Sequence, residues 1–567
     1  MSLNSSTQTF HQFFSSLGFD DNPFAYTNAD QEERLSSYFI PPPYFNSVFG
    51  NPEQPRSFIV FAPRGGGKSA QRIMIEHKCV DNEVLAITYD QFEFPDIAKA
   101  TDVKLHHHLR RILRFSLVGL LVNLHSDPLL EEQLTKEEKQ IFLKLAAEHL
   151  CEIKGADLEI ALNSLKSFKD KFKDFWNEWI PAIGPGIKAL SSLMKPIADL
   201  GDIGGLAKYQ DPEFKSSKSL KYQLRLTVDL AHKLGWKCIY ILVDRVDESS
   251  LTGNSAKDSF ALLEPLLRDL QLLEFPGIGF KFFLWDLLQS ECERVVRTDR
   301  IDLEILDWDK DMLKRLWEKR LCAFSREQIS SLEQISTPTS PYTIDDLAFT
   351  FANHSPRDMI RIGGKILSEQ QELDPFSKRV DELAIYRGIE KFCSQRAAEI
   401  ITKSKVLQEL KKVRQVDFTI PYLANEVFRE KQASTRSRMV VWRQQAAIIE
   451  VERIDDPRSK QKLPVKLFAI KDIRVAKEIY PELDTSEFLK RKYRRCPNCD
   501  ATVLRDWGDS DSSNTCHDCR WDLSGQRDDV EGWRRKELAT RRRRQYREET
   551  LDSEAIQLSF LDNDSLT

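Results

Sequence analysis

The stretch Ser57-Phe-Ile-Val-Phe-Ala-Pro-Arg-Gly-Gly-Gly-Lys-Ser69 decides the fold, because a buried strand there runs directly into a phosphate-binding loop. The apolar residues 58–61 predict the strand, and a helical pattern follows from Gln71. Glycines allow successive backbone N–H groups to turn toward an anion, and the following helix presents its positive end to the same anion. Strand, loop and helix therefore occur in the order that nucleotide binding requires.

Each position of this loop has an expected task. Lys68 would reach the β- and γ-phosphates of a nucleotide, and the Ser69 hydroxyl would ligate Mg²⁺. Ala62 stands where such loops usually begin with glycine. The predicted nucleotide-binding residues are Ala62, Pro63, Arg64, Gly65, Gly66, Gly67, Lys68, Ser69 and Ala70.

Length and composition describe an ordinary water-soluble protein of about three or four domains. The chain has 567 residues, of which 41% are hydrophobic and 30% charged, and its net charge is −5. Any nucleic-acid surface must therefore be local. Residues 1–19 lack a signal-peptide pattern, and the apolar run 115–123 is too short to span a bilayer. Singly scattered cysteines indicate reduced thiols, and we expect a cytoplasmic protein.

An acidic partner for the loop follows a second apolar run. Residues 239–243 read as a parallel strand that is buried on both faces, and Asp244 comes at its carboxyl end. Ligands of open α/β sheets bind at that edge. A carboxylate there would hold Mg²⁺ through water, and either Asp247 or Glu248 would orient or deprotonate the attacking water.

Three later features fit the same kind of site. The apolar run from 277 ends at Asp286, which predicts another core strand followed by a polar side chain. A basic group containing Arg294, Arg297 and Arg300 comes next. In Asn353-His-Ser-Pro-Arg-Asp-Met-Ile-Arg361, Ser355 and Pro356 favour the start of a helix. Arg357 then falls in the first turn, against the dipole preference, which favours a functional reason for it.

These motifs resemble the AAA+/STAND division of P-loop ATPases, nearest to origin-recognition-type and related bacterial ATPases. The resemblance covers roughly residues 20–390. It implies that Asp286 contacts the γ-phosphate or the attacking water, and that Arg357 is a second sensor at the start of a lid helix. It also implies that one of the basic-group arginines reaches a neighbouring subunit, although solvated helix-end charges explain them equally well.

The resemblance leaves the catalytic base open. In most AAA+ ATPases a glutamate directly follows the Mg²⁺-binding aspartate, and here that position is Arg245. Either Asp247 or Glu248 supplies the base, with Glu248 favoured, or hydrolysis is slow and the site acts as a switch. The predicted catalytic residues are Lys68, Asp244, Asp247, Glu248, Asp286 and Arg357, and Mg²⁺ is assigned to Ser69 and Asp244.

Segments before and inside the core have their own expected roles. Residues 22–33 and 41–45 resemble the linker that packs beside the adenine, although their aromatic residues also suit plain core anchors.

The chain between Lys68 and Asp244 is much longer than a minimal AAA+ core requires. Helices predicted at 105–124, 136–152 and 157–179 indicate a helical insertion, followed by a Gly/Pro-broken loop to Gly205 that would contact a partner. Glycine and proline argue against membrane binding by this loop.

After the lid, the pattern indicates a winged helix. Helical segments at 403–412, 418–428 and 434–445 precede strands at 448–454 and 465–470 that are joined by a basic loop. In helix-turn-helix readers the later helix enters the major groove of DNA. Here it carries Arg436, Arg438 and Arg443. Domains of this kind also serve as protein-packing modules, and origin-recognition-type ATPases carry a winged helix in this place.

A zinc ribbon is predicted from Cys496-Pro-Asn-Cys499 and Cys516-His-Asp-Cys519. Each pair places two thiolates on one tight turn, and together they complete a closed tetrahedral site for structural Zn²⁺.

Basic runs at 490–495 and 534–547, interleaved with aromatic residues, suit contact with nucleic acid. A solvated arginine-rich helix is the alternative. The pentapeptide Gln557-Leu-Ser-Phe-Leu561 resembles the element by which bacterial proteins dock on the replication sliding clamp.

The sequence thus predicts an α/β protein with a parallel-sheet P-loop core, a helical insertion and lid, a winged helix and a zinc ribbon. The expected divisions are a linker at 1–50, a core at 51–310 with the insertion at about 100–225, a lid at 311–395, a winged helix at 396–485, a ribbon at 486–530, and a basic helix with a flexible acidic tail at 531–567.

The function expected from these parts is an ATPase that couples its nucleotide state to binding or assembly on DNA, together with a partner effector or copies of itself. By resemblance it would serve a bacterial replication, mobile-element or phage-defence system. The alternative is a STAND-like switch with slow hydrolysis that recognises a protein.

Overall fold

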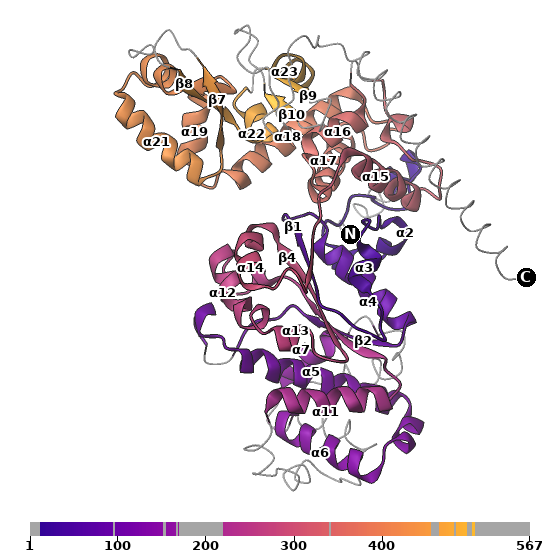
Figure 1. Cartoon of the computed structure of the whole chain (residues 1–567). Helices are drawn as coiled ribbons and strands as arrows, with labels where there is room; N and C mark the ends of the chain where they lie inside the picture. Colours follow the sequence, from indigo (N-terminus) through magenta and orange to yellow (C-terminus); the bar gives the residue numbers. More distant parts are fainter. Residues whose placement is uncertain are drawn as a thin grey trace, which may run out of the picture. The chain divides into compact units, whose positions relative to one another are not determined.

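The structure, a computed structural model, describes residues 12–94, 97–150, 155–165, 168, 219–338, 342–454, 464–480, 483–495 and 502–504 (Figure 1). The chain divides into two compact units. The sheet unit comprises Pro23–Ser330 and His354–Ile360. The C-terminal unit comprises Met1–Asn22, Ser331–Asn353 and Arg361–Thr567.

A five-stranded parallel sheet forms the centre of the sheet unit, in the order β2-β3-β4-β1-β5. Its strands are β1 (Phe58–Ala62), β2 (Val84–Tyr89), β3 (Cys238–Val243), β4 (Ile278–Trp285) and β5 (Asp302–Ile305). Every residue of β1, β2 and β3 is buried, which explains why these strands read as continuous apolar runs. The prediction of an α/β protein with a parallel sheet is confirmed.

The connections between strands create a crevice at one edge of this sheet. From β1 the chain crosses to β2 at the far edge, whereas from β4 it passes β1 to reach β5. Adjacent strands β1 and β4 therefore send their connections in opposite directions. Ligands of open α/β sheets bind outside the carboxyl ends of the strands at such a point. The loop after β1 lies at this position.

Helices cover both faces of the sheet. Right-handed crossovers place the helix after β1 on one face and the helices of the later connections on the other. The helix α4 (Lys68–Asp81) packs on β1, β2 and β4, while α5 (Leu105–Ser126) and α12 (Ala256–Leu267) contact each other. Among its described residues, the unit's other α-helices are α2 (Leu35–Tyr38), α3 (Phe45–Phe49), α6 (Lys136–Leu150), α7 (Gly155–Asn163), α11 (Leu220–Lys233), α13 (Leu270–Leu273), α14 (Gln289–Val295) and α15 (Lys310–Phe324).

The long connection between β2 and β3 is helical where it is described. Its helix α5 packs on α6, α7, α11 and β2. The helix predicted at 157–179 is not continuous, because α7 ends at Asn163, and residues 166–167 and 169–179 lie outside the described residues. The carbonyl of Ser164 accepts a hydrogen bond from the backbone N–H of Thr88 in the edge strand β2, at 2.9 Å. This pairing satisfies an N–H group of the edge strand just beyond the end of α7. The predicted loop that reaches Gly205 lies outside the described residues.

The C-terminal unit begins with helices and continues with a small antiparallel sheet of order β6-β8-β7. The α-helices described in it from Ser331 onward are α16 (Ile344–Ala352), α17 (Pro356–Leu373, whose first turn belongs to the sheet unit), α18 (Glu382–Ile400), α19 (Ser404–Val413), α20 (Ile420–Tyr422), α21 (Gln432–Gln444), α22 (Ile473–Glu478) and α23 (Thr485–Lys492). Its strands are β6 (Asp417–Thr419), β7 (Ile448–Ile454), β8 (Val465–Ile470), β9 (Tyr493–Arg495) and β10 (Thr502–Leu504). Among the described residues, no helix combines the length and apolar character that crossing a bilayer requires.

Candidate functional site

The loop after β1 has the conformation that its glycines permit. Gly65 and Gly67 have φ angles of 78° and 92°, in the region that side chains disfavour. A Cβ atom on Gly66 would lie 2.9 Å from the carbonyl oxygen of Pro63. The helix α4 begins at Lys68, three residues earlier than its apolar pattern indicates, and has no acidic residue in its first turn. Its N-terminus therefore presents unopposed positive partial charge to the loop.

Side chains from β5 onward support the loop from outside. The indole Nε1–H of Trp308 donates to the carbonyl of Gly66 at 2.7 Å. The Nδ1–H of His354 donates to the carbonyl of Trp308 at 2.7 Å. Gly65 lies so close to Arg357 that a Cβ atom on it would come within 2.8 Å of the arginine Cβ. The predicted sensor residue Arg357 thus lies directly against the loop.

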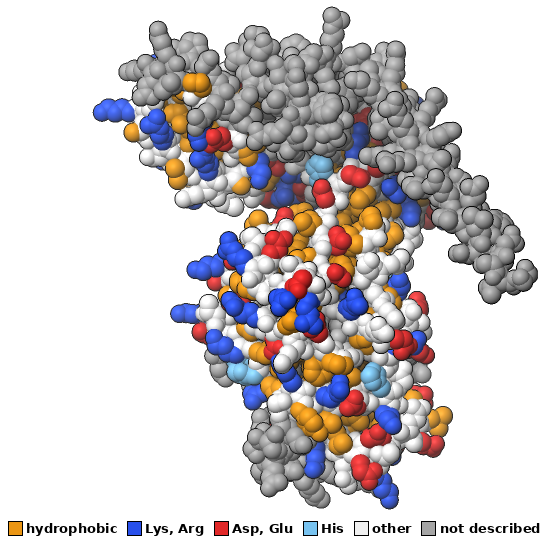
Figure 2. Space-filling model, viewed as in Figure 1, with side chains coloured by type: hydrophobic (Ala, Val, Ile, Leu, Met, Phe, Trp, Pro, Cys, Tyr) orange, Lys and Arg blue, Asp and Glu red, His pale blue; other side chains and the backbone are white. Residues whose placement is uncertain are grey.

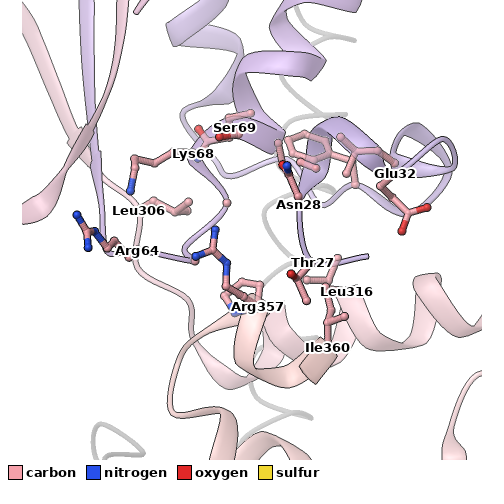
Figure 3. Close-up of a pocket in the computed structure, with 18 of the residues that line it drawn as sticks. Thr27, Asn28, Glu32, Arg64, Lys68, Ser69, Leu306, Leu316, Arg357 and Ile360 are labelled. Carbon is pink, nitrogen blue, oxygen red and sulfur yellow. The ribbon is translucent and has the colours of Figure 1, made fainter. Parts of the chain in front are cut away.

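The loop opens into a cavity of about 420 Å³ within the sheet unit (Figure 3). That volume falls within the ~300–1,000 Å³ range of small-molecule sites. Of the predicted site residues, the cavity is lined by Arg64, Gly65, Gly67, Lys68, Ser69, Ala70, Asp244, Asp247, Glu248 and Arg357. The predicted residues that do not line it are Ala62, Pro63, Gly66 and Asp286.

Lys68 connects these groups electrostatically. Its Nζ donates to the carbonyls of Ala62 and Pro63, both at 3.1 Å. Burial lowers the pKa of Lys68, and the carboxylates of Asp247, Asp244 and Asp286 partly oppose this shift. Asp286 directly follows β4, so its charge acts on Lys68 although it does not line the cavity.

The far wall of the cavity comes from the N-terminal part of the sheet unit. Tyr26, Thr27 and Asn28 line it, together with residues of α2 and of α15. The guanidinium of Arg320, on α15, is buried and fixes this segment, since it donates to the carbonyls of Pro23 and Tyr26 and to the carboxylate of Glu32. The segment expected to lie beside the base therefore shares a cavity with the glycine loop after β1.

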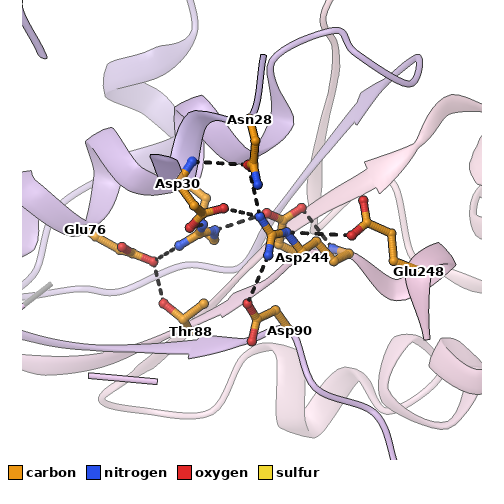
Figure 4. Close-up of polar contacts among 9 residues, drawn as sticks. Asn28, Asp30, Glu76, Thr88, Asp90, Asp244 and Glu248 are labelled. Carbon is orange, nitrogen blue, oxygen red and sulfur yellow. Dashed lines mark hydrogen bonds and ion pairs between the residues drawn. The ribbon is translucent and has the colours of Figure 1, made fainter. Parts of the chain in front are cut away.

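The carboxylate predicted to serve Mg²⁺ is buried and firmly held. Asp244 follows β3 and is 1% exposed. One of its oxygens accepts from the backbone N–H of Arg245 at 2.9 Å, and the other accepts from Nε of Arg72 at 3.0 Å. Arg72, on α4, is itself fully buried and also donates to Glu76 and Asp30 (Figure 4). Burial opposes the charge of Arg72, but Glu76, Asp244 and Asp30 outweigh it and raise its pKa well above the ordinary value.

The two candidate bases differ in their surroundings. Asp247 accepts from Arg64 at 2.9 Å, and its side chain is 10% exposed. Arg64 also donates to Asn254 at 2.8 Å and stacks over the ring of Trp285 at 4.0 Å. The side chain of Glu248 is 62% exposed and lies 3.9 Å from Nε of Arg245. Asp247 is thus neutralised by a loop arginine, whereas Glu248 remains accessible to water.

Sequence reasoning missed three residues of this site: Asp30, Arg72 and Trp308. Arg72 comes four residues after Lys68, so helical periodicity places both side chains on one face of α4 and provided a signal. Trp308 follows β5, the neighbour of β1, within an otherwise acidic segment. Asp30 meets Arg72 across 42 residues of sequence, and only the fold brings them together.

The basic residues expected on the DNA-reading helix have different environments. Arg438 donates to Glu409 and Glu430 and lies 4.4 Å from the ring centroid of Phe428. Arg443 pairs with Glu450 at 3.2 Å, and it is exposed, as is Arg436. Arg438 therefore fixes α21 in its own unit, which leaves Arg436 and Arg443 as the outward-facing cations among the three.

Several predicted features lie outside the described residues: Cys496, Cys499, Cys516 and Cys519, the basic run 534–547, and the pentapeptide Gln557 to Leu561. Over the part of the chain that is described, no group of three or more His, Cys, Asp or Glu side chains is arranged to hold a metal ion. Each cysteine there carries a free thiol: Cys79, Cys238, Cys292, Cys322 and Cys393.

Comparisons with known proteins complete the description. No model of a known protein family matches this chain, and no curated protein matches it. The site geometry must therefore carry the functional argument.

Proposed function

We propose that the sheet unit binds ATP with Mg²⁺ and hydrolyses it, and that the chain is a P-loop ATPase of the AAA+/STAND type. One observation carries this proposal. Lys68 and Ser69 at the start of α4, Asp244 after β3 and Arg357 on α17 line the same cavity of about 420 Å³. A cation, a hydroxyl and a carboxylate gathered at a glycine loop suit a nucleoside triphosphate.

The charges around the acidic strand fit a bound magnesium ion. Arg72 and Arg245 link Asp244 to the carboxylates of Asp30, Glu76, Asp90 and Glu248, and Lys68 also interacts electrostatically with Asp244. The carboxylates outnumber the cations, and oxygen donors are what Mg²⁺ prefers. Ser69 and Asp244 would hold the ion. Held there, the ion would supply positive charge against the negative charge that develops during phosphoryl transfer.

Each remaining residue has a role that its position supports. The loop N–H groups and Lys68 bind and orient the phosphates, and Arg357 reports the γ-phosphate to α17. Glu248 is the better general base, because Arg64 already neutralises Asp247. Asp286 orients Lys68 through its charge, which acts across the end of β4.

The test is hydrolysis of ATP by the purified protein, with and without duplex or single-stranded DNA. Lys68→Ala and Glu248→Gln should each lower kcat by at least about 100-fold, because they remove phosphate binding and the general base. Lys139→Ala, at a partly exposed ion pair on α6, is the matched control and should retain wild-type turnover.

DNA-stimulated turnover that both site variants lose would support a nucleic-acid-coupled ATPase. Binding of ATP without turnover, unchanged by DNA, would instead support the second candidate, a slow nucleotide switch that recognises a protein. Arg245 at the position after Asp244 and the Arg64–Asp247 pair favour that candidate. A wild-type protein that binds no nucleotide would overturn both.

The C-terminal unit supports the coupling to DNA. Its element order, α19, β6, α20, α21, β7 and β8, with β7 and β8 as an antiparallel pair, is compatible with a winged helix. Several Lys and Arg side chains are visible over α19 and α21 in Figure 2. We propose that α21 contacts DNA and that the zinc ribbon and basic C-terminal run add to the grip. A sliding clamp, an effector protein or further copies of the chain are proposed partners, in a cytoplasmic setting.

A further inference from the structure

One carboxylate joins two arginines beside the cavity, next to Asp244. Asp30 belongs to the N-terminal segment, and its side chain is 12% exposed. Its Oδ1 accepts from Nη2 of Arg72 at 2.6 Å, and its Oδ2 accepts from Nη2 of Arg245 (Figure 4). Asn28, two residues earlier, also accepts from Arg245, at 3.3 Å. Both arginines therefore depend on this short segment.

The same two arginine residues hold Asp244. Nε of Arg72 donates to one of its oxygens, and the backbone N–H of Arg245 donates to the other. Asp30, Arg72, Asp244 and Arg245 thus form a closed ring, which we call the arginine clasp. The ring joins the N-terminal segment, α4 and the end of β3, which are three separate parts of the sheet unit.

The position of the clasp gives it more than a packing role. Asn28 and its neighbours Thr27 and Ala29 line the cavity, and so do Asp244 and Arg245. A ligand that contacts Thr27, Asn28 or Ala29 therefore touches the segment that carries Asp30. Through its two arginine partners, Asp30 is connected to Asp244. Arg245 has a φ angle of 56°, a backbone conformation that non-glycine residues rarely adopt. Its ion pair with Asp30 supplies a compensating contact for this conformation.

We propose that Asp30 is a positioning residue for the proposed nucleotide site: through Arg72 and Arg245 it orients the Asp244 carboxylate toward the metal-bearing end of a bound nucleotide. This inference rests on the proposed function. In this arrangement Arg245 holds the segment that carries Asp30 next to Asp244. Partners that orient a metal-binding carboxylate typically contribute about 10–100-fold to metal affinity or activity.

The test measures how strongly the full-length protein binds a fluorescent ATP analogue across a Mg²⁺ titration. Asp30→Asn keeps the shape of the side chain but removes its charge. The Mg²⁺ concentration for half-maximal tightening should rise about 10-fold, while affinity in EDTA stays within about twofold because Lys68 and the loop are intact. Asp30→Glu keeps the charge and should bring the Mg²⁺ requirement most of the way back to the wild-type value. Glu264→Gln, at a surface ion pair with Arg268 on α12, is the matched control.

Arg245→Gln is a second test of the same ring, for the case in which Asp30→Asn does not fold. The Arg245 side chain is 23% exposed, so this change is the less disruptive one. It should raise the Mg²⁺ requirement as Asp30→Asn does, and the double variant should add little further, because both changes open one ring.

Folded variants whose Mg²⁺ requirement stays within about twofold of wild type would overturn the inference and leave the proposed function standing. A wild-type protein that binds no analogue at any Mg²⁺ concentration would overturn the proposed function itself, and the inference with it.

Discussion

Lys281 is a buried amine in the middle of β4, away from the proposed chemistry. Its Nζ donates to the carbonyl of Arg56 at 2.7 Å and lies 4.5 Å from the ring centroid of Tyr240. Burial lowers the pKa of Lys281 to about 8, from 10.5 in the unfolded chain. Below pH 8 both states carry the proton, and the folded protein bears the full cost of burying the charge. Between pH 8 and 10.5 the unfolded chain binds more protons, so stability rises with pH.

We therefore expect Lys281→Met to stabilise the sheet unit most near pH 7. The difference in free energy of unfolding between variant and wild type should shrink by about 1 kcal/mol for each pH unit between 8 and 10. In that range the wild-type amine loses its proton in the folded state. Urea unfolding of both proteins at pH 7, 8.5 and 10 measures this difference. Lys257→Met, at an exposed position on α12, should show no such pH-dependent gain. A gain that is the same at all three pH values would contradict the argument.

Gly66 is the loop position where added volume alone should weaken nucleotide binding. A Cβ atom there would meet backbone, the carbonyl of Pro63 at 2.9 Å, and backbone cannot rotate away. We expect Gly66→Ala to weaken ATP binding at least about 10-fold, which calorimetric titration would measure. The control is Gly235→Ala, which has a φ angle of 87° but nothing within 4 Å of the new atom. It should cost about 1 kcal/mol of stability and leave ATP affinity unchanged.

At the scale of elements, α21 is the part of the C-terminal unit that most directly tests DNA binding. Arg436 is exposed on it, whereas Arg438 is engaged by Glu409 and Glu430. We expect Arg436→Ala to weaken binding of duplex DNA by about 10-fold and, if it contacts a phosphate, to reduce the salt slope by about 1. Fluorescence anisotropy at several salt concentrations measures both.

Lys405→Ala, at an exposed position on α19, is the matched control and should change DNA affinity by less than about twofold. Equal losses in both variants would show attraction spread over the surface rather than contact by α21. No loss in either would move the proposed DNA contact away from this element.

At the scale of the whole molecule, the cavity belongs entirely to one compact unit. Every described residue that lines it falls within Pro23–Ser330 and His354–Ile360. We expect ATP with Mg²⁺ to raise the melting temperature of the sheet unit in scanning calorimetry, with about 2.7 kcal/mol of added stability at 100 times Kd. Lys68→Ala should lose this shift while melting normally without nucleotide. A shift that persists in Lys68→Ala would place the ligand elsewhere.

Local sequence was sufficient for the parts of the site that depend on chain order. A buried strand that leads into glycines and then a helix can form few other structures, so the loop from Ala62 to Ala70 and its helix were predictable. The same holds for Asp244, because a doubly buried parallel strand is continuously apolar and ends where the first charge occurs. The end of α7 at Asn163 was not predictable from local sequence, and the Ser164 carbonyl just beyond it bonds to Thr88, which belongs to another element.

The sequence by itself determined which residues form the glycine loop, the acidic strand end and the parallel sheet, since strand burial and backbone freedom act over neighbouring residues. Only the tertiary structure decided which charges meet. Asp30 reaches Arg72 and Arg245, Arg64 neutralises Asp247, and Trp308 holds the loop at Gly66. Ion pairs and hydrogen bonds depend on distances of a few ångströms between segments far apart in the chain, and composition and periodicity do not encode those distances.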